Sequence, residues 1–309
     1  MFSLLITRTL HATSRPDESI LLLPNTFLFG VSTSSYQVEG GWDLGGKAPS
    51  IWDDFVHFNG TTPLGHSGWI ADHSNGDFAD ETYDTYVLRA DVERMARLGI
   101  ANYRFSISWP RLLPSGYVNA TRADGGANPI AVRYYQTLLA MLAENEIKAH
   151  VTLFHWDLPS VLQARLGGWL SPKLPLLFRD YAALCFRLFG SSSAAIASWF
   201  TINEPWSIAV GAYYQGGMAP LGAGALGGGN SSSEPYIVAH HLLLAHAHAV
   251  DAFRSGGALF AGEIAIVLNS NWWAPDPNAT NASHAEELAQ RARIFQVGGR
   301  EERFSLTVI

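Results

Sequence analysis

The sequence is short of cysteine, of charge and of long hydrophobic runs, and each shortage excludes a class of protein. Cys185 is the single cysteine among 309 residues, so the chain can form neither an internal disulfide nor a cysteine-based metal cluster. Charged residues make up 15% of the sequence, and their balance gives a formal charge of -7. Because phosphate binding needs clustered lysine and arginine, this balance argues against a nucleic-acid partner. No apolar run approaches the ~20 residues that span a bilayer, so we expect a soluble chain without a membrane span.

The first 23 residues are poor in acidic residues: no acid precedes Asp17, whereas Arg8 and Arg15 follow a short apolar start. A secretory signal places its positive charge before a longer apolar stretch, which is the reverse of this order. The Asn-x-Ser/Thr sequons slightly favour the secretory route; they begin at Asn59, Asn119, Asn230, Asn278 and Asn281. We interpret residues 1–23 as an N-terminal extension that could be a targeting segment, and the sequence leaves the secretory route and an organelle both open.

Apolar and aromatic residues are plentiful: 48% of the chain is hydrophobic and 12% is aromatic, with 10 tryptophans. A large core is the simplest explanation of this content. A second explanation is a sugar site, since pyranose rings stack on indole rings while their hydroxyls meet directed hydrogen bonds. Composition alone favours the core.

Segments with strand patterns and segments with helix patterns alternate along the chain. The expected strands cover residues 27–33, 101–107, 148–154, 199–202 and 264–268. The expected helices cover residues 81–98, 128–146, 171–190, 234–253 and 285–295. This alternation without hairpin signals predicts parallel strands covered by helices, which leaves a doubly wound sheet or a (β/α)8 barrel.

Polar and aromatic residues cluster just after successive expected strands, at Gln37, Arg104, His155, Glu204 and Asn269. Function carried at the carboxyl ends of many strands is typical of a TIM barrel, and no Gly-x-Gly-x-x-Gly turn supports the doubly wound alternative. Only five strands are available. We therefore predict an α/β fold in which residues 24–298 form an incomplete (β/α)8 barrel of about five βα units, followed by a divergent tail at 299–309.

Glu204 and Pro205 end the fourth expected strand, in the sequence Thr-Ile-Asn-Glu-Pro. The proline predicts an extended backbone at Glu204. The neighbouring Trp199, Phe200 and Trp206 predict that the carboxylate is partly desolvated. From this fragment alone, a proton-donating catalytic acid and a structural glutamate paired with an arginine are equally favoured.

Four further motifs occur in register with that one: Phe27-Leu-Phe-Gly-Val-Ser-Thr-Ser-Ser-Tyr-Gln37-Val-Glu39-Gly-Gly, Tyr103-Arg104-Phe-Ser-Ile-Ser-Trp109-Pro-Arg111, Leu153-Phe-His155-Trp156-Asp157-Leu-Pro159 and Gly167-Gly-Trp169-Leu. Together and in this order, they resemble glycoside hydrolase family one, the β-glucosidase family. The resemblance covers about residues 24–296. Each motif would be weak alone, but their shared order makes the resemblance specific.

The resemblance implies a sugar-binding role for each matching side chain. Gln37 is similar to the first-strand amide that hydrogen-bonds two adjacent hydroxyls of the glycone sugar. His155 matches the histidine that binds another hydroxyl, and Trp156 forms a wall of the same subsite. Asn203 corresponds to the amide that contacts the 2-hydroxyl, a bond that strengthens in the transition state.

The resemblance also implies a retaining reaction with no metal or organic cofactor, in which a small β-glycoside or oligosaccharide loses its terminal β-D-glucosyl residue. Glu204 matches the acid/base, and Arg104 resembles the arginine beneath the two carboxylates that keeps the nucleophile ionised. The family's nucleophile lies on the seventh strand in an Ile/Val-Thr-Glu-Asn-Gly motif, which these 309 residues do not contain. We therefore expect the chain to be inactive as written, or alternatively to be a non-catalytic carbohydrate- or protein-binding member of the family.

Structural roles are the competing explanation for several of these residues. For His155 we favour sugar binding over a satisfied core histidine, because it follows a strand end. For Trp109 and Trp169 we favour core packing. For Glu39 and Asp157 we favour a role in holding loops at the rim.

Overall fold

The computed structural model describes residues 27–190, 195–221 and 229–269, together with 283, 284, 286–288 and 290. The expected extension at 1–23, most of the expected helix at 285–295 and the tail at 299–309 lie outside these residues. Five strands lie within them: β1 (Gly30–Ser32), β2 (Asn102–Ser106), β3 (Lys148–Phe154), β4 (Ile196–Asn203) and β5 (Glu263–Val267). Each strand pairs in parallel with the next in chain order, which confirms the incomplete TIM barrel.

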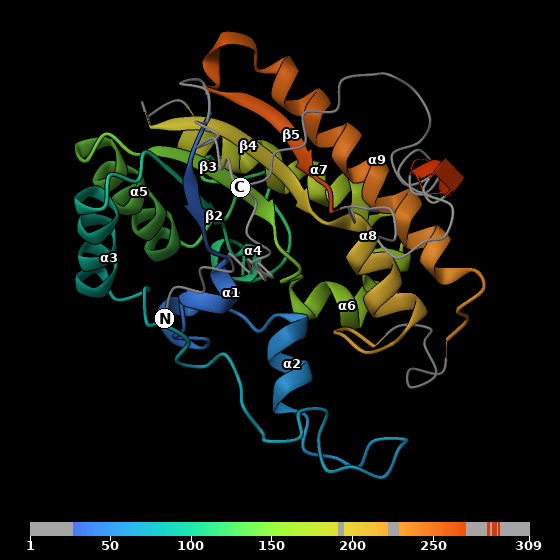
Figure 1. The fold of residues 1–309 in the computed structure, drawn as a ribbon. Helices are drawn as coiled ribbons and strands as arrows, with labels where there is room; N and C mark the ends of the chain where they lie inside the picture. The colour runs from blue at the N-terminus through green and yellow to red at the C-terminus, as the bar shows by residue number, and fades with distance from the viewer. Residues whose placement is uncertain are drawn as a thin grey trace, which may run out of the picture.

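The long helices lie on the outer side of the curved sheet, as Figure 1 shows for α3 (Thr85–Arg97), α5 (Pro129–Glu144), α7 (Leu174–Cys185) and α9 (Glu234–Ser255). Shorter helices lie beyond the carboxyl ends of the strands: α1 (Ser35–Val38), α2 (Ile51–His57), α4 (Trp109–Leu112), α6 (Ser160–Leu166) and α8 (Pro205–Ser207). The short 3-10 helices are η1 (Leu44–Gly46), η2 (Gly168–Leu170) and η5 (Gly257–Leu259), and the short π-helices are η3 (Phe186–Gly190) and η4 (Ile208–Tyr214). Within the described part of the chain, no helix is long and apolar enough to cross a bilayer.

Side-chain caps determine where two of the expected helices begin. The Asn128 side chain accepts a hydrogen bond from the Ile130 amide at 3.1 Å, and Pro129 occupies the first helical position of α5 as expected. Helix α3 begins later than residue 81, because Asp84 caps it by accepting from the Tyr86 amide at 2.7 Å. At these two helices the capping side chain marks where the helix begins.

The first expected strand is longer than the observed one. Residues 27–29 do not continue β1, and Phe27, Leu28 and Phe29 are 48%, 69% and 55% exposed. Among the described residues β1 has a neighbour on one side only, β2, so the apolar run at 27–29 has no second strand to cover it.

The outer face of the sheet carries the aromatic core. Trp109 is fully buried and stacks on Tyr181 with ring centroids 4.5 Å apart, and Trp169 packs against Phe154 at 5.3 Å. Trp199 on β4 contacts Phe186 at 5.0 Å on the same side. The packing role expected for Trp109 and Trp169 is therefore observed.

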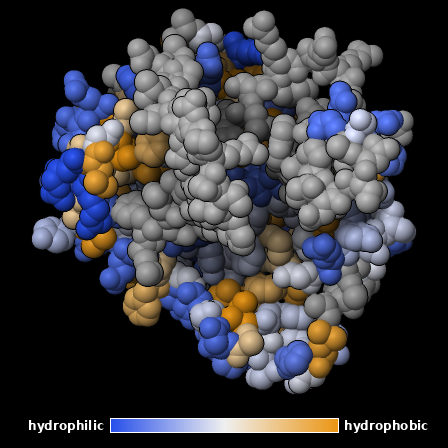
Figure 2. Space-filling view, in the orientation of Figure 1, coloured by the Kyte–Doolittle hydropathy of each residue, from blue (hydrophilic) through white to orange (hydrophobic). Residues whose placement is uncertain are grey.

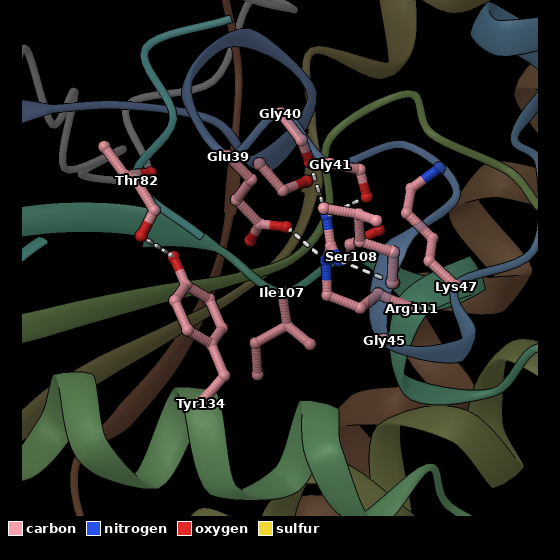
Figure 3. Close-up of polar contacts among 12 residues, drawn as sticks. Glu39, Gly40, Gly41, Gly45, Lys47, Thr82, Ile107, Ser108, Arg111 and Tyr134 are labelled. Atoms are coloured by element: carbon pink, nitrogen blue, oxygen red, sulfur yellow. Dashed lines mark hydrogen bonds and ion pairs between the residues drawn. The ribbon is translucent and has the colours of Figure 1, made fainter. Parts of the chain in front are cut away.

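A buried ion pair joins the segments that follow β1 and β2 (Figure 3). The Arg111 guanidinium donates to Glu39 Oε2 and to the Gly40 carbonyl, each at 2.7 Å, and lies 3.8 Å from the centre of the Tyr83 ring. The Tyr135 hydroxyl on α5 donates to the other oxygen of Glu39 at 2.7 Å. Because both charged side chains are almost fully buried, the charge of each is balanced by the charge of the other and not by water.

A second buried carboxylate cluster continues this network. Asp53 caps α2 through the Ser50 amide at 2.6 Å and pairs with Lys47 at 2.8 Å. Asp157 accepts from the Ser35 hydroxyl at 2.9 Å, and burial raises its pKa to about 7. Glu39 and Asp157 thus hold the loops at the carboxyl ends of the strands, as predicted.

Replacing Arg111 tests this network. Arg111→Ala leaves the Glu39 carboxylate buried without its cation, and we expect the free energy of unfolding to fall by about 3–5 kcal/mol. Urea denaturation followed by circular dichroism measures the change. Arg179→Ala is the matched control, because Arg179 pairs with Asp180 at the surface, where ion pairs contribute little. Equal losses in the two variants would contradict the role of the buried pair.

Candidate active site

The inner face of the sheet, opposite the helices, is polar and leads to the carboxyl ends of the strands. Arg104, Thr152 and Asn203 come from three neighbouring strands, and Arg104 donates hydrogen bonds to the other two on this face. Figure 2 shows hydrophilic residues, in blue, deep in the hollow at the middle of the face viewed in Figure 1. The predicted site residues lie at or just after these strand ends.

Arg104 is the centre of the polar contacts. Its Nε donates to Thr152 Oγ1 at 2.9 Å, its Nη2 donates to Asn203 Oδ1 at 2.5 Å, and its guanidinium lies over the Phe200 ring at 5.3 Å. Burial lowers the pKa of Arg104 to about 10, and the charge of Glu204 acts in the opposite direction. Arg104 therefore remains a cation at neutral pH and lies close enough to Glu204 to respond to its charge.

A register shift in β4 brings Asn203 to this face. The pairing of β4 with β5 slips between Phe200 and Asn203, so the strict alternation of side chains is broken there. The Asn203 amide then reaches Arg104, while Thr201 points to the other side and hydrogen-bonds His246 of α9 at 2.8 Å.

The backbone of Glu204 is left-handed, with φ 48° and ψ 66°, and not extended as Pro205 predicted. The chain passes directly from β4 into α8, and the Glu204 amide still donates to the Val267 carbonyl at 2.9 Å. A proline disfavours the right-handed helical conformation before it, which leaves the left-handed one for a turn this tight. Such a conformation costs on the order of 1–3 kcal/mol and is typical of functional sites.

The Glu204 carboxylate is half-buried and oriented by its neighbours. The Ser207 hydroxyl donates to Glu204 Oε2 at 2.8 Å, and Asn269 Nδ2 donates to the Ser207 hydroxyl at 3.1 Å. Within the described residues no ion pair joins Glu204 to an arginine, so the interpretation as a structural ion pair gains no support.

The aromatic surround expected for Glu204 is formed only in part. Trp199 lies on the opposite face of β4, where its Nε1 donates to the Ala261 carbonyl at 3.1 Å. Trp206 is 61% exposed. Neighbours in sequence alternate between the two faces of a strand, so adjacency to Glu204 did not place these rings beside its carboxylate.

His155 and Trp156 directly follow β3, and Trp156 reaches the end of β4 through a hydrogen bond to the Asn203 carbonyl. The His155 Nδ1 is buried without a hydrogen-bond partner, and burial together with the Arg104 charge lowers the pKa of the ring to about 3. By contrast, His150 deeper on β3 has both ring nitrogens engaged, by Ser198 at 2.7 Å and Asn102 at 3.1 Å. His155 is therefore not a satisfied core histidine, and its neutral ring can exchange a hydrogen bond with a hydroxyl.

Gln37 is less closely integrated than the other predicted residues. It lies in α1 and not in the first strand, its side chain is exposed, and its Oε1 accepts from the Ser34 hydroxyl at 2.7 Å. The structure thus brings Arg104, His155, Trp156, Asn203 and Glu204 together at the ends of β2 to β4, with Gln37 at the rim.

Sequence reasoning missed two residues of the site, Thr152 and Ser207. A signal for Ser207 was present, because it lies three residues after Glu204 at the start of a helix, where such spacings bring side chains together. Thr152 carried no such signal. Among the described residues no group of three or more histidine, cysteine, aspartate or glutamate side chains is placed to hold a metal ion.

Comparison with known proteins gives one consistent family. Residues 21–298 match glycosyl hydrolase family 1. A furostanol glycoside 26-O-β-glucosidase from Hellenia speciosa is 43% identical over 280 residues, which is 89% of this chain and 46% of that protein. β-Glucosidase 24 from rice is 42% identical over 283 residues, which is 89% of this chain and 52% of that protein.

Solved structures agree with these relatives. A rice β-glucosidase, a glutamate-to-glutamine mutant in a covalent complex with glucose, has 34% identity and a TM-score of 0.74 over 89% of this chain and 54% of that one. A family 1 β-glucosidase from Thermotoga maritima has 32% identity and a TM-score of 0.70 over 87% of this chain and 54% of that one. The chain spans about half the length of the proteins it matches.

The protonation state of His155 is directly measurable. With a pKa of about 3, its ring should stay neutral from pH 8 down to pH 5, where a histidine in the unfolded chain, with a pKa of about 6.5, becomes charged. Nitrogen-15 NMR of the imidazoles, assigned with His155→Gln, follows each ring. A His155 ring that titrates between pH 6 and 7 would rule out the burial and charge effects described above.

Proposed function

Because the chain belongs to glycosyl hydrolase family 1, we propose that it supplies the acid/base half of a site that hydrolyses terminal β-D-glucosyl residues of small β-glycosides or oligosaccharides, with retention of configuration. The relatives named as β-glucosidases support the substrate class. The covalent glucose complex of the rice relative supports a glycosyl-enzyme intermediate. Glu204 is the proposed acid/base.

The placement of Glu204 is the observation that carries the proposal. Its carboxylate is half-buried at a strand end, is oriented by Ser207, and lies near the fixed charge of Arg104. A carboxyl group so placed can donate a proton to the leaving oxygen and later take one from water.

The sugar-binding roles proposed for Asn203 and His155 follow from what their polar atoms already bind. Asn203 Oδ1 accepts from Arg104, so its NH2 group is the part available to donate to a sugar oxygen. The His155 ring is neutral and has an unpaired buried nitrogen. Gln37 at the rim offers both a donor and an acceptor to two further hydroxyls.

Retaining hydrolysis also needs a second carboxylate about 5–5.5 Å from the first. The buried carboxylates of the described residues, Glu39, Asp53 and Asp157, serve the network around Arg111 and Lys47. We therefore propose that these 309 residues hold only the acid/base half of the site and do not hydrolyse glycosides alone. The alternative is a non-catalytic carbohydrate- or protein-binding protein of the same family.

An activity assay of the 309-residue chain tests whether it holds only the acid/base half of the site. With an aryl β-glucoside we expect no turnover above the buffer rate, because the buried carboxylates of the described residues, apart from Glu204, serve the networks around Arg111 and Lys47. Steady retaining hydrolysis would contradict the proposal. An NMR titration of the chain with glucose, run beside the assay, separates the two candidate functions. The binding protein would be favoured if the chain binds glucose without turnover and if a longer polypeptide that includes the remaining strands is also inactive.

The acid/base role of Glu204 is tested in a polypeptide that also supplies the second carboxylate. Glu204→Gln should slow hydrolysis of glucosides with poor leaving groups by about 10²–10⁴-fold, the usual contribution of a general acid. Good leaving groups need no proton, so their glycosylation step should change much less. Glu263→Gln is the matched control on β5, where the side chain is exposed. Equal losses for both kinds of leaving group would exclude Glu204 as the acid.

A further inference from the structure

The peptide that joins Asn203 to Glu204 is held at both of its polar atoms. Its carbonyl accepts a hydrogen bond from Trp156 Nε1 at 2.8 Å, and its N–H donates to the Val267 carbonyl at 2.9 Å. The first partner follows β3 and the second ends β5, so the two strands next to β4 grip this one peptide from opposite sides. We call these two hydrogen bonds the peptide clamp.

The clamp holds a backbone conformation that is unfavourable by itself. Glu204 has φ 48° and Trp156 has φ 74°, and both residues carry a Cβ that crowds the backbone in this left-handed region. Conformations of this kind persist when surrounding contacts over-determine them. Pro205, the residue after Glu204, is the first residue of α8, and the clamp holds the peptide before Glu204.

We propose that Trp156 is a positioning residue that sets the direction of both Asn203 and Glu204 through its indole N–H. One peptide plane connects the two residues, so its rotation would turn the Asn203 amide away from Arg104 and the Glu204 carboxylate away from Ser207 together. The clamp thus couples the 2-hydroxyl-binding amide to the proton donor. The importance of this coupling for catalysis rests on the proposed function of Glu204.

The donor-only character of the indole explains why a tryptophan suits this position. Trp156 Nε1–H can only donate, so it always presents a proton to the Asn203 carbonyl, whatever the pH. The ring is half-buried, so it remains partly exposed while its edge makes the bond. Trp169 differs, because its buried Nε1 has no partner and its side chain contributes packing alone.

Trp156→Phe removes the N–H and keeps an aromatic ring at the position. In the 309-residue chain we expect hydrogen exchange of the Glu204 amide to accelerate about three- to tenfold, which corresponds to the net loss of one hydrogen bond. We also expect the carbon-13 resonance of the Asn203 carbonyl to move upfield. The Val151 amide, inside β3, serves as the internal reference for global stability.

Trp169→Phe is the matched control, since it removes an indole from the same region without removing a hydrogen bond. After scaling to Val151, it should leave the Glu204 amide and the Asn203 carbonyl unchanged. The proposal is overturned if Trp156→Phe and Trp169→Phe act alike on these two signals. A second test needs no substitution. The unsubstituted chain should show an NMR scalar coupling across the hydrogen bond, between Trp156 Nε1 and the Asn203 carbonyl carbon. If this coupling is absent, the clamp is also overturned.

These measurements are independent of turnover. If the exchange and coupling results hold while Glu204→Gln affects good and poor leaving groups equally, the clamp stands and the acid/base assignment fails. If the leaving-group experiment succeeds while the exchange results fail, Glu204 is the acid but Trp156 does not position it.

Discussion

Arg104 places a permanent positive charge inside the curved sheet, and the site is arranged around the need to compensate it. Its hydrogen bonds go to Thr152 on β3 and Asn203 on β4, so one side chain joins three neighbouring strands in addition to their backbone pairing. The same charge helps to keep His155 neutral and acts on Glu204 through space. One buried cation therefore contacts three strands, helps to keep the His155 ring neutral, and lies near the carboxylate of Glu204.

The strands and long helices were predictable because their signals are local. Strand β3 matches its expected bounds, since polar and apolar side chains alternate along most of Lys-Ala-His-Val-Thr-Leu-Phe, as expected of a strand. Helix α5 begins where Asn128 and Pro129 indicated. The short helices α1, α2 and α6 were not predicted, because segments of four to seven residues show too little of a helical period and are stabilised by contacts with distant loops.

The candidate site was predictable in its residue types and only partly in its geometry. Motif order pointed to Glu204, Asn203, His155 and Arg104, and the structure brings these side chains to one end of the sheet. The left-handed backbone of Glu204 and the outward turn of Trp199 depend on β5 and on Ala261 just before it, which lie some 60 residues further along the chain. Local reasoning about Pro205 and about adjacent aromatics could not include partners so distant.

The slipped pairing in β4 has a consequence for which changes this site can tolerate. Within a strand, each residue added or removed reverses the face on which every later side chain emerges. The stretch from Phe200 to Glu204 must therefore keep its length if Asn203 is to meet Arg104, even where the identity of the intervening residues changes. Diversification is then expected by substitution inside this stretch and by insertion or deletion only beyond Pro205, where the chain has already left the sheet.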